Sequence, residues 1–328
     1  MDVKAQRINA YNQWPASVTF RAEAEFRSRL SEQDGQIPFE PIALVANKAA
    51  EYHRCVGHLI DGLDALPDRP DYFFDHCFKL LDLAKTTVAP GGGNRGVMER
   101  LPGELLTLDR KSWEAIADEL GRAIPRTTVD FLAKRLLEAQ LGQGKYAKEL
   151  KERAEEVMGA KFYSAFCKKY LCDENGQPTG SFQGKLQKAG SLLRLYLSGK
   201  PASRKGKASH PDLEFRGKKI SAEERMKALL SLLLFTVRNE RAHGVVISPF
   251  RTSKATMARY ESYYFLMLTA YVFALGTLAL RFKGNSVASA DILAGCKANL
   301  AIQARFFNST RYVVTDAEAE PEAEAEAV

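Results

Sequence analysis

Residues 262–280 read SYYFLMLTAYVFALGTLAL, nineteen positions without a charged side chain. A run of this length is long enough to cross a bilayer. Its apolar character is diluted, however, by Tyr263, Tyr264, Thr269, Tyr271, Gly276 and Thr277. No second run of this kind accompanies it. The segment therefore predicts a helix buried on all sides in a helical protein, and no membrane span.

The remainder of the chain carries the same helical pattern. Apolar residues recur at three- and four-residue spacing, whereas alternating runs bounded by hairpin turns are missing. We therefore predict an all-α protein. The expected helices span residues 19–34, 41–66, 71–88, 111–122, 128–141, 145–158, 160–171, 181–197, 222–243, 253–282 and 287–307.

Two interruptions divide this helical pattern. Residues 89–96, APGGGNRG, predict a loop, because consecutive glycines lose much backbone entropy in a helix. No Lys-Ser/Thr pair follows them, so they do not form a phosphate-binding loop. Residues 172–180, CDENGQPTG, are dense in turn formers. We therefore expect an N-terminal all-helical region of unknown role over 1–172 and a C-terminal helical bundle over 173–310.

Charge is unevenly distributed along the 328 residues. The sequence ends in a disordered, acidic Ala/Glu tail, expected over 311–328, in which six acidic residues and no basic one follow position 315. Without these six, 47 basic residues face 34 acidic ones, a formal charge of +13. Clustered basic residues release the counterions condensed on nucleic acid, so a polyanionic partner is expected. The tail is interpreted either as a solubilising end or as a competitor of RNA for the basic surface.

A basic loop is expected over residues 198–220. It is either a solvated linker or a contact to phosphates. The candidate RNA-binding residues in it are Arg204, Lys205, Lys207, Lys218 and Lys219.

No motif predicts a metal or another cofactor. The five cysteines are odd in number and contain no CxxC pair, which indicates reduced thiols in a cytoplasmic protein. The first fifteen residues lack the apolar stretch of a secretory signal. His53 and His58 are five residues apart, not the four that place two ligands on one helical face, so we interpret them as core or surface residues. His76 lies among phenylalanines and is interpreted as packing.

Residues 221–244, SAEERMKALLSLLLFTVRNERAHG, predict a helix with clear ends. Ser221 and Glu224 fit a capping box at its start, and Gly244 fits a left-handed residue at its end. Between them an apolar stem runs directly into the polar sequence from Arg238 to His243. Such a helix delivers ionisable groups to the rim of a core.

Arg238, Asn239 and His243 resemble the Arg-Asn-x-x-x-His signature of the HEPN superfamily over about residues 181–308. Arg69 with His76, and Arg204 with His210, also fit the bare spacing, but neither follows a long amphipathic helix. The resemblance implies a four-helix bundle and a metal-independent endoribonuclease of toxin–antitoxin, phage-defence or CRISPR effector systems. It implies Arg238 and His243 as catalytic residues, with Asn239 orienting them.

The resemblance implies cleavage by the ribose 2′-hydroxyl, which leaves a 2′,3′-cyclic phosphate and spares DNA. An antitoxin or another defence protein is an implied partner. Family members controlled by tyrosine AMPylation carry a Tyr two residues after the His, where this chain has Val245. The alternative function is a non-catalytic RNA- or protein-binding HEPN module in a larger defence assembly.

Arg238 and His243 are five residues apart, which places them about 140° from alignment on a regular helix. Either the helix ends near Ala242 and redirects His243, or two chains combine their motifs in a homodimer with a composite site. HEPN proteins resemble the second case, so we predict a homodimer, with the 265–280 helix as part of its interface. Arg241 and Arg251 are candidate RNA-binding residues beside the motif. Arg241 could instead pair with Glu240 or Asp291.

Overall fold

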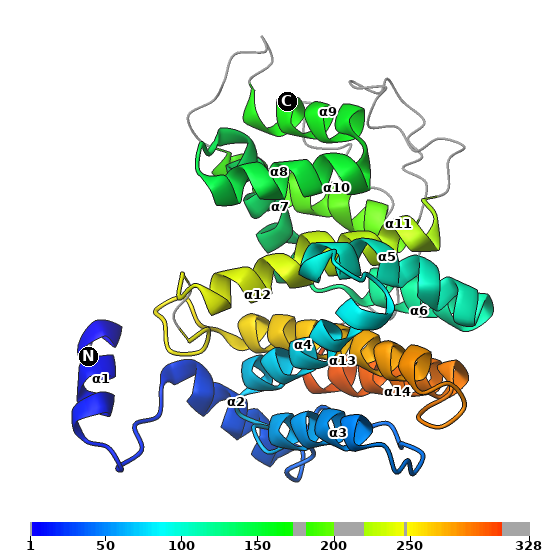
Figure 1. Cartoon of the computed structure of the whole chain (residues 1–328). Helices are drawn as coiled ribbons and strands as arrows, with labels where there is room; N and C mark the ends of the chain where they lie inside the picture. The colour runs from blue at the N-terminus through cyan, green and yellow to red at the C-terminus, as the bar shows by residue number, and fades with distance from the viewer. Residues whose placement is uncertain (1, 173–181, 200–219, 246–247, 310–328) are drawn as a thin grey trace.

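A computed structural model describes residues 2–172, 182–199, 220–245 and 248–309, and this part of the chain is all-α, without a strand (Figure 1). In chain order the helices are α1 (Val3–Asn12), α2 (Arg21–Glu32), α3 (Ala50–Leu63), α4 (Pro70–Thr87), α5 (Gly93–Leu108), α6 (Arg110–Ala123), α7 (Arg126–Leu141), α8 (Lys145–Met158), α9 (Ala160–Leu171), the 3-10 turn η1 (Gln183–Lys185), α10 (Leu186–Ser198), α11 (Ala222–Lys227), the π-helical turn η3 (Ala228–Leu234), α12 (Phe235–Ala242), α13 (Met257–Arg281) and α14 (Ser289–Phe306).

Helix α13 forms the centre of the core. It packs against α4, α14, α5, α2 and α7, and every side chain from Ser262 to Leu280 is buried. At Gly276 it lies close to Trp113 of α6, since a β-carbon there would lie 2.6 Å from the Trp113 ring. Among the described helices, α13 alone is long and apolar enough to span a membrane, and 94% of its apolar window is buried in the fold. The predicted buried core helix is confirmed.

This burial corrects one prediction about α13. The 265–280 segment cannot form part of a dimer interface, because its side chains are already enclosed by helices of the same chain. The apolar run reflects a position at the centre of the protomer. An interface between two copies must use other helices.

The two sides of the expected boundary at 172/173 share one core. Helix α10 packs against α6 and α7, and α13 packs against α4 (Figure 1). The contact between α6 and α10 is close, since a β-carbon on Gly121 would lie 2.0 Å from the carbonyl oxygen of Leu197. The C-terminal helices therefore pack on N-terminal helices as well as on one another.

Residues 41–49, expected as the start of a helix, have no regular secondary structure, and α3 begins only at Ala50. Side chains of the core bind this main chain. The amide of Ile42 donates to the hydroxyl of Tyr271 at 2.8 Å. Asn299 accepts from the amide of Glu40 and donates to its carbonyl, both at 2.8 Å. This segment and Glu40 before it thus receive from core side chains some of the hydrogen bonds that a helix would supply internally.

The expected loop 89–96 is shorter than predicted, because α5 begins at Gly93. Gly91 still has a left-handed backbone, with φ of 77°. Beyond it, Val97, Met98, Leu101 and Leu105 recur at helical spacing and are buried. Burial of this apolar face outweighs the entropic cost of glycine in the first turn. Helices α1 and α5 had no counterpart among the predicted helices.

Some predicted features lie outside the described residues. They include most of the basic loop 198–220, with Arg204, Lys205, Lys207, Lys218 and Lys219, and the whole of the acidic tail 311–328.

Candidate functional site

The helix that carries the Arg-Asn-x-x-x-His sequence begins and ends as predicted. The amide of Glu224 donates to the hydroxyl of Ser221 at 3.1 Å, and the Glu224 carboxylate accepts from the Ser221 amide at 2.9 Å. At the other end Gly244 has φ of 64°. The amide of Gly244 donates to Arg241 and that of Val245 donates to Glu240, which is a Schellman motif. Helix α12 therefore ends at Ala242, and His243 is its C-cap.

A wide π-helical turn, η3, lies in the middle of this helix. All seven of its side chains are buried. Arg153 of α8, itself buried, donates to the carbonyl of Ser231 and to the hydroxyl of Thr236, and its guanidinium lies over the ring of Phe235. Burial lowers the pKa of Arg153 to about 10. The turn thus joins the stem of the motif helix to α8 through a buried cation.

The polar residues at the end of α12 face different neighbours. Glu240 is 4% exposed and accepts from Arg135 of α7, with Arg135 Nη2 at 3.0 Å. Burial raises the pKa of Glu240, although Arg135 opposes the shift. Arg241 faces α4, whereas Arg238 donates only to Asn239, at 3.3 Å, within the described residues. The motif is therefore held between α7 and α4.

A cleft of about 340 Å³ lies between α4 and the end of α12. Its walls combine four basic and three acidic side chains. The lining residues are Arg69, Asp71, Tyr72, Asp75, Phe78, Lys79, Asp82, Arg238, Arg241, Ala242 and Ser248.

A network of two arginines and two aspartates forms the floor of this cleft. Asp71 is fully buried and accepts from Arg69 at 2.9 and 2.7 Å and from Arg241 Nη1 at 3.0 Å. Asp75 accepts from Arg241 at 2.9 and 2.6 Å in a bidentate pair. Burial would lower the pKa of Arg241, but Asp75 and Asp71 outweigh it and raise that pKa. The guanidinium of Arg69 also stacks 3.6 Å from the ring of Tyr72.

These ion pairs change the interpretation of two predicted RNA contacts. Arg241 pairs with Asp71 and Asp75, so the expected partners Glu240 and Asp291 are both wrong. Arg251 donates to Glu23 of α2 at 2.8 Å. Arg241 donates through all three nitrogens and could bind a phosphate only by giving up a carboxylate of the same chain, whereas Arg251 donates to Glu23 through Nε alone.

Arg238 differs from the other arginines of the cleft. Within the described residues, no carboxylate lies within 4.0 Å of its guanidinium, whereas Arg69 and Arg241 are both neutralised by aspartates. His243 is exposed at the end of the helix, one residue beyond Ala242 on the cleft wall. No hydrogen bond joins its imidazole to Arg238 in the described part of the chain. The cleft therefore presents one guanidinium without a carboxylate partner in the described residues, and the exposed His243 directly follows a residue of its lining.

Arg69, set aside on its sequence context, lies in the same cleft as Arg238. Its spacing partner His76 faces elsewhere. The ion pairs of Arg241 with α4 hold the start of α4, and with it Arg69, beside the end of α12, and no local pattern indicates such a contact between residues far apart in the chain. The pairs of Arg241 with α4 were missed for the same reason.

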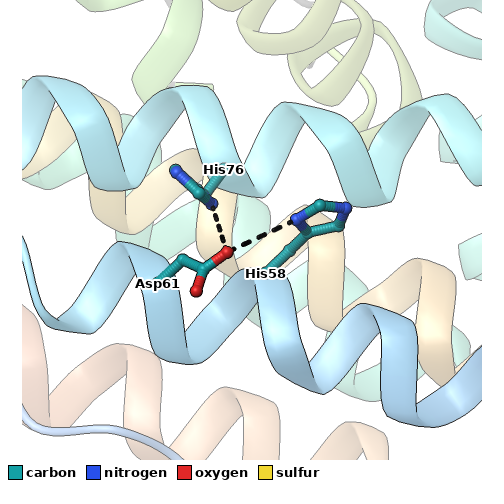
Figure 2. Close-up of side chains that lie close together, drawn as sticks. All are labelled: His58, Asp61 and His76. Atoms are coloured by element: carbon teal, nitrogen blue, oxygen red, sulfur yellow. Dashed lines mark ion pairs between the residues drawn. The ribbon is translucent and has the colours of Figure 1, made fainter.

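A second group of ionisable side chains lies between α3 and α4 (Figure 2). The Nδ1 atoms of His58 and His76 lie 4.0 and 3.9 Å from the same oxygen of Asp61. Burial lowers the pKa of His76, with Lys79 adding to the effect and Asp61 opposing it. Sequence reasoning interpreted both histidines separately. The signal it missed is the three-residue spacing of His58 and Asp61, which places them on one face of a helix.

Comparison of the chain with known protein families, with curated proteins and with solved structures finds no match.

Proposed function

We propose that the chain is a metal-independent HEPN endoribonuclease that cleaves RNA at the rim of the cleft between α12 and α4. The observation that supports this best is Arg238, which lines the cleft without a carboxylate partner in the described residues. A guanidinium without a carboxylate partner can donate two parallel hydrogen bonds to a phosphate. The proposal includes a HEPN-like bundle in residues 173–310, a cytoplasmic location and a role as toxin or anti-phage effector.

RNA cleavage of this kind needs only side chains of α12 and of its C-cap, His243. Imidazole exchanges protons near neutral pH, so His243 would take the proton of a ribose 2′-hydroxyl or protonate the leaving 5′-oxygen. Arg238 would stabilise the charge that develops on the phosphate. Asn239, which accepts from Arg238, would orient that guanidinium. The products are a 2′,3′-cyclic phosphate and a 5′-hydroxyl.

We further propose that the active enzyme is a homodimer, in which a second copy of the chain completes the site. His243 is exposed at the helix end, and each chain carries one such motif. Two copies related by a twofold axis would bring the exposed His243 of one to the cleft of the other. The surface around the end of α12 would then form the interface, in place of the enclosed helix α13.

The test is RNA cleavage by the full chain in the presence of EDTA. Arg238→Ala and His243→Ala should each lower the rate by roughly 10²–10⁴-fold, the contribution typical of a positioned acid or base or of a charge-stabilising donor. Arg54→Ala and His53→Ala, at exposed positions on α3, are the matched controls and should keep full activity. Cleavage that survives both motif substitutions in folded protein would refute the catalytic assignment.

Two further readouts separate the alternatives. If the site is composite, mixing Arg238→Ala protein with His243→Ala protein restores part of the activity, because a mixed dimer contains one intact pair. Recovery should reach about a quarter of the wild-type rate or less, since half of the dimers are mixed and each has one working site. RNA binding without cleavage by the wild-type chain would instead identify the non-catalytic HEPN module.

A further inference from the structure

We propose that His58, Asp61 and His76 bind a divalent transition-metal ion, with Zn²⁺ as the ion that fits best. None of the three residues lines the cleft at the end of α12. The site and its test are therefore independent of the proposed ribonuclease activity.

The three side chains converge on one point from two helices. His58 and Asp61 lie on α3, and His76 lies on α4, which packs along α3. Figure 2 shows the two imidazoles and the carboxylate turned toward one another. One nitrogen of each histidine and one oxygen of Asp61 all lie within 4.8 Å of one another. Three donors that meet across a helix pair form a preorganised set.

The distances suit a shared ion. Two ligands bound at about 2.1 Å can be at most about 4.2 Å apart. The Asp61 oxygen lies 3.9 and 4.0 Å from the two Nδ1 atoms, inside this limit and beyond hydrogen-bonding distance. The two imidazole nitrogens lie within 4.8 Å of each other, so binding of one ion would draw the rings closer together. A metal between the three atoms would thus convert near contacts into bonds.

Packing alone does not explain why the Nδ1 atoms of His58 and His76 lack hydrogen-bond partners in the described residues. The imidazole rings lie 5.8 Å apart at 62°, which is an ordinary aromatic contact. Yet both Nδ1 atoms are buried and have no hydrogen-bond partner within the described residues. Buried polar atoms normally have partners. Two of them facing one carboxylate oxygen indicate a ligand that supplies the missing bonds.

The donor set selects the class of ion. Two imidazole nitrogens and one carboxylate oxygen suit Zn²⁺ and its neighbours, whereas Mg²⁺ and Ca²⁺ prefer oxygen ligands alone. Three protein ligands leave a fourth position for water. Asp61 is 63% exposed, so that position opens to solvent. The ion would clip α3 to α4, the helix whose Asp71 and Asp75 form the floor of the cleft.

The experiment is calorimetric titration of the full chain, without a polyhistidine tag and stripped by a chelator, with ZnCl₂. We expect one tight site per chain. His76→Gln and Asp61→Asn should each weaken Zn²⁺ binding by at least ~10–100-fold. His53→Gln, an exposed histidine on α3 outside the cluster, should bind as the wild type does, and CaCl₂ should give no saturable binding.

A second readout uses Co²⁺, whose visible absorption changes when nitrogen ligands bind it. The wild type and His53→Gln should show the new bands, and Asp61→Asn and His76→Gln should lose them. Far-UV circular dichroism keeps misfolding apart from lost ligation, because Asp61 is mostly exposed and its substitution leaves the core intact. Absence of a tight Zn²⁺ site, or Zn²⁺ binding unchanged in both cluster variants, would overturn the proposal.

Discussion

Asp71 is the residue at which a small change should destabilise the fold most clearly. Its carboxylate is fully buried and accepts three hydrogen bonds, two from Arg69 and one from Arg241. The substitution Asp71→Asn keeps the shape of the side chain and removes its charge. Two guanidiniums, 16% and 12% exposed, then lose the carboxylate that they share. Loss of one partner from a buried ion pair costs about 3–5 kcal/mol of unfolding free energy.

The same helix provides matched controls. Asp82 also lines the cleft, but it is 38% exposed, and among the described residues it pairs only with Lys85, at 3.5 Å. Asp82→Asn should cost at most about 1 kcal/mol, as exposed ion pairs do. Asp75→Asn should fall between the two, because Asp75 holds Arg241 with two bonds at a half-exposed position. Urea unfolding followed by circular dichroism measures all three, and a cost for Asp71→Asn no larger than that of Asp82→Asn would refute this reasoning.

Other substitutions test the packing and the thiols. Gly121→Ala should lower the free energy of unfolding by about 2 kcal/mol or more, because its β-carbon would meet the carbonyl of Leu197 at 2.0 Å. Gly57→Ala on α3, where a β-carbon has free space, should instead raise it by about 0.5–1 kcal/mol. Urea unfolding midpoints compare the two, and equal shifts would contradict the close approach of α6 and α10. At about pH 8 a disulfide reagent should label only Cys172, since burial raises the pKa of Cys55 to about 11 and raises those of the other three buried thiols, leaving little reactive thiolate. Native labelling that persists in Cys172→Ser would disprove this.

The helices could be predicted wherever periodicity and end signals agreed. The capping box at Ser221 and the left-handed Gly244 are local features, and the structure confirms both. The segment 41–49 was mispredicted because main-chain amides in it, those of Ile42 and Val45, donate to Tyr271 and Ser286, more than two hundred residues away. Helix α5 was missed because burial outweighs its glycine-rich start. Local propensity does not register either effect.

The candidate site likewise has one part that could be predicted from the sequence and one part that could not. Residues 238–243 form a linear signal, and their place at a helix end follows from sequence. The partners of Arg241 on α4 could not be predicted, because they depend on how two helices pack. The cluster of His58, Asp61 and His76 also spans two helices, and only the spacing of the first two is visible in sequence.

The wide turn at 228–234 also sets the angular position of the side chains on α12. Relative to a regular α-helix, one such turn contains one additional residue. If the same seven residues adopted regular α-helical geometry instead, α12 would rotate by about 100° about its axis. Arg238 would then leave the cleft, and Arg241 would lose Asp75, although the apolar composition of the stem would hardly change. The wide turn therefore keeps Arg238 in the cleft at this chain length, and a related sequence with one residue fewer here should have a regular α-helix that places the same side chains in the cleft.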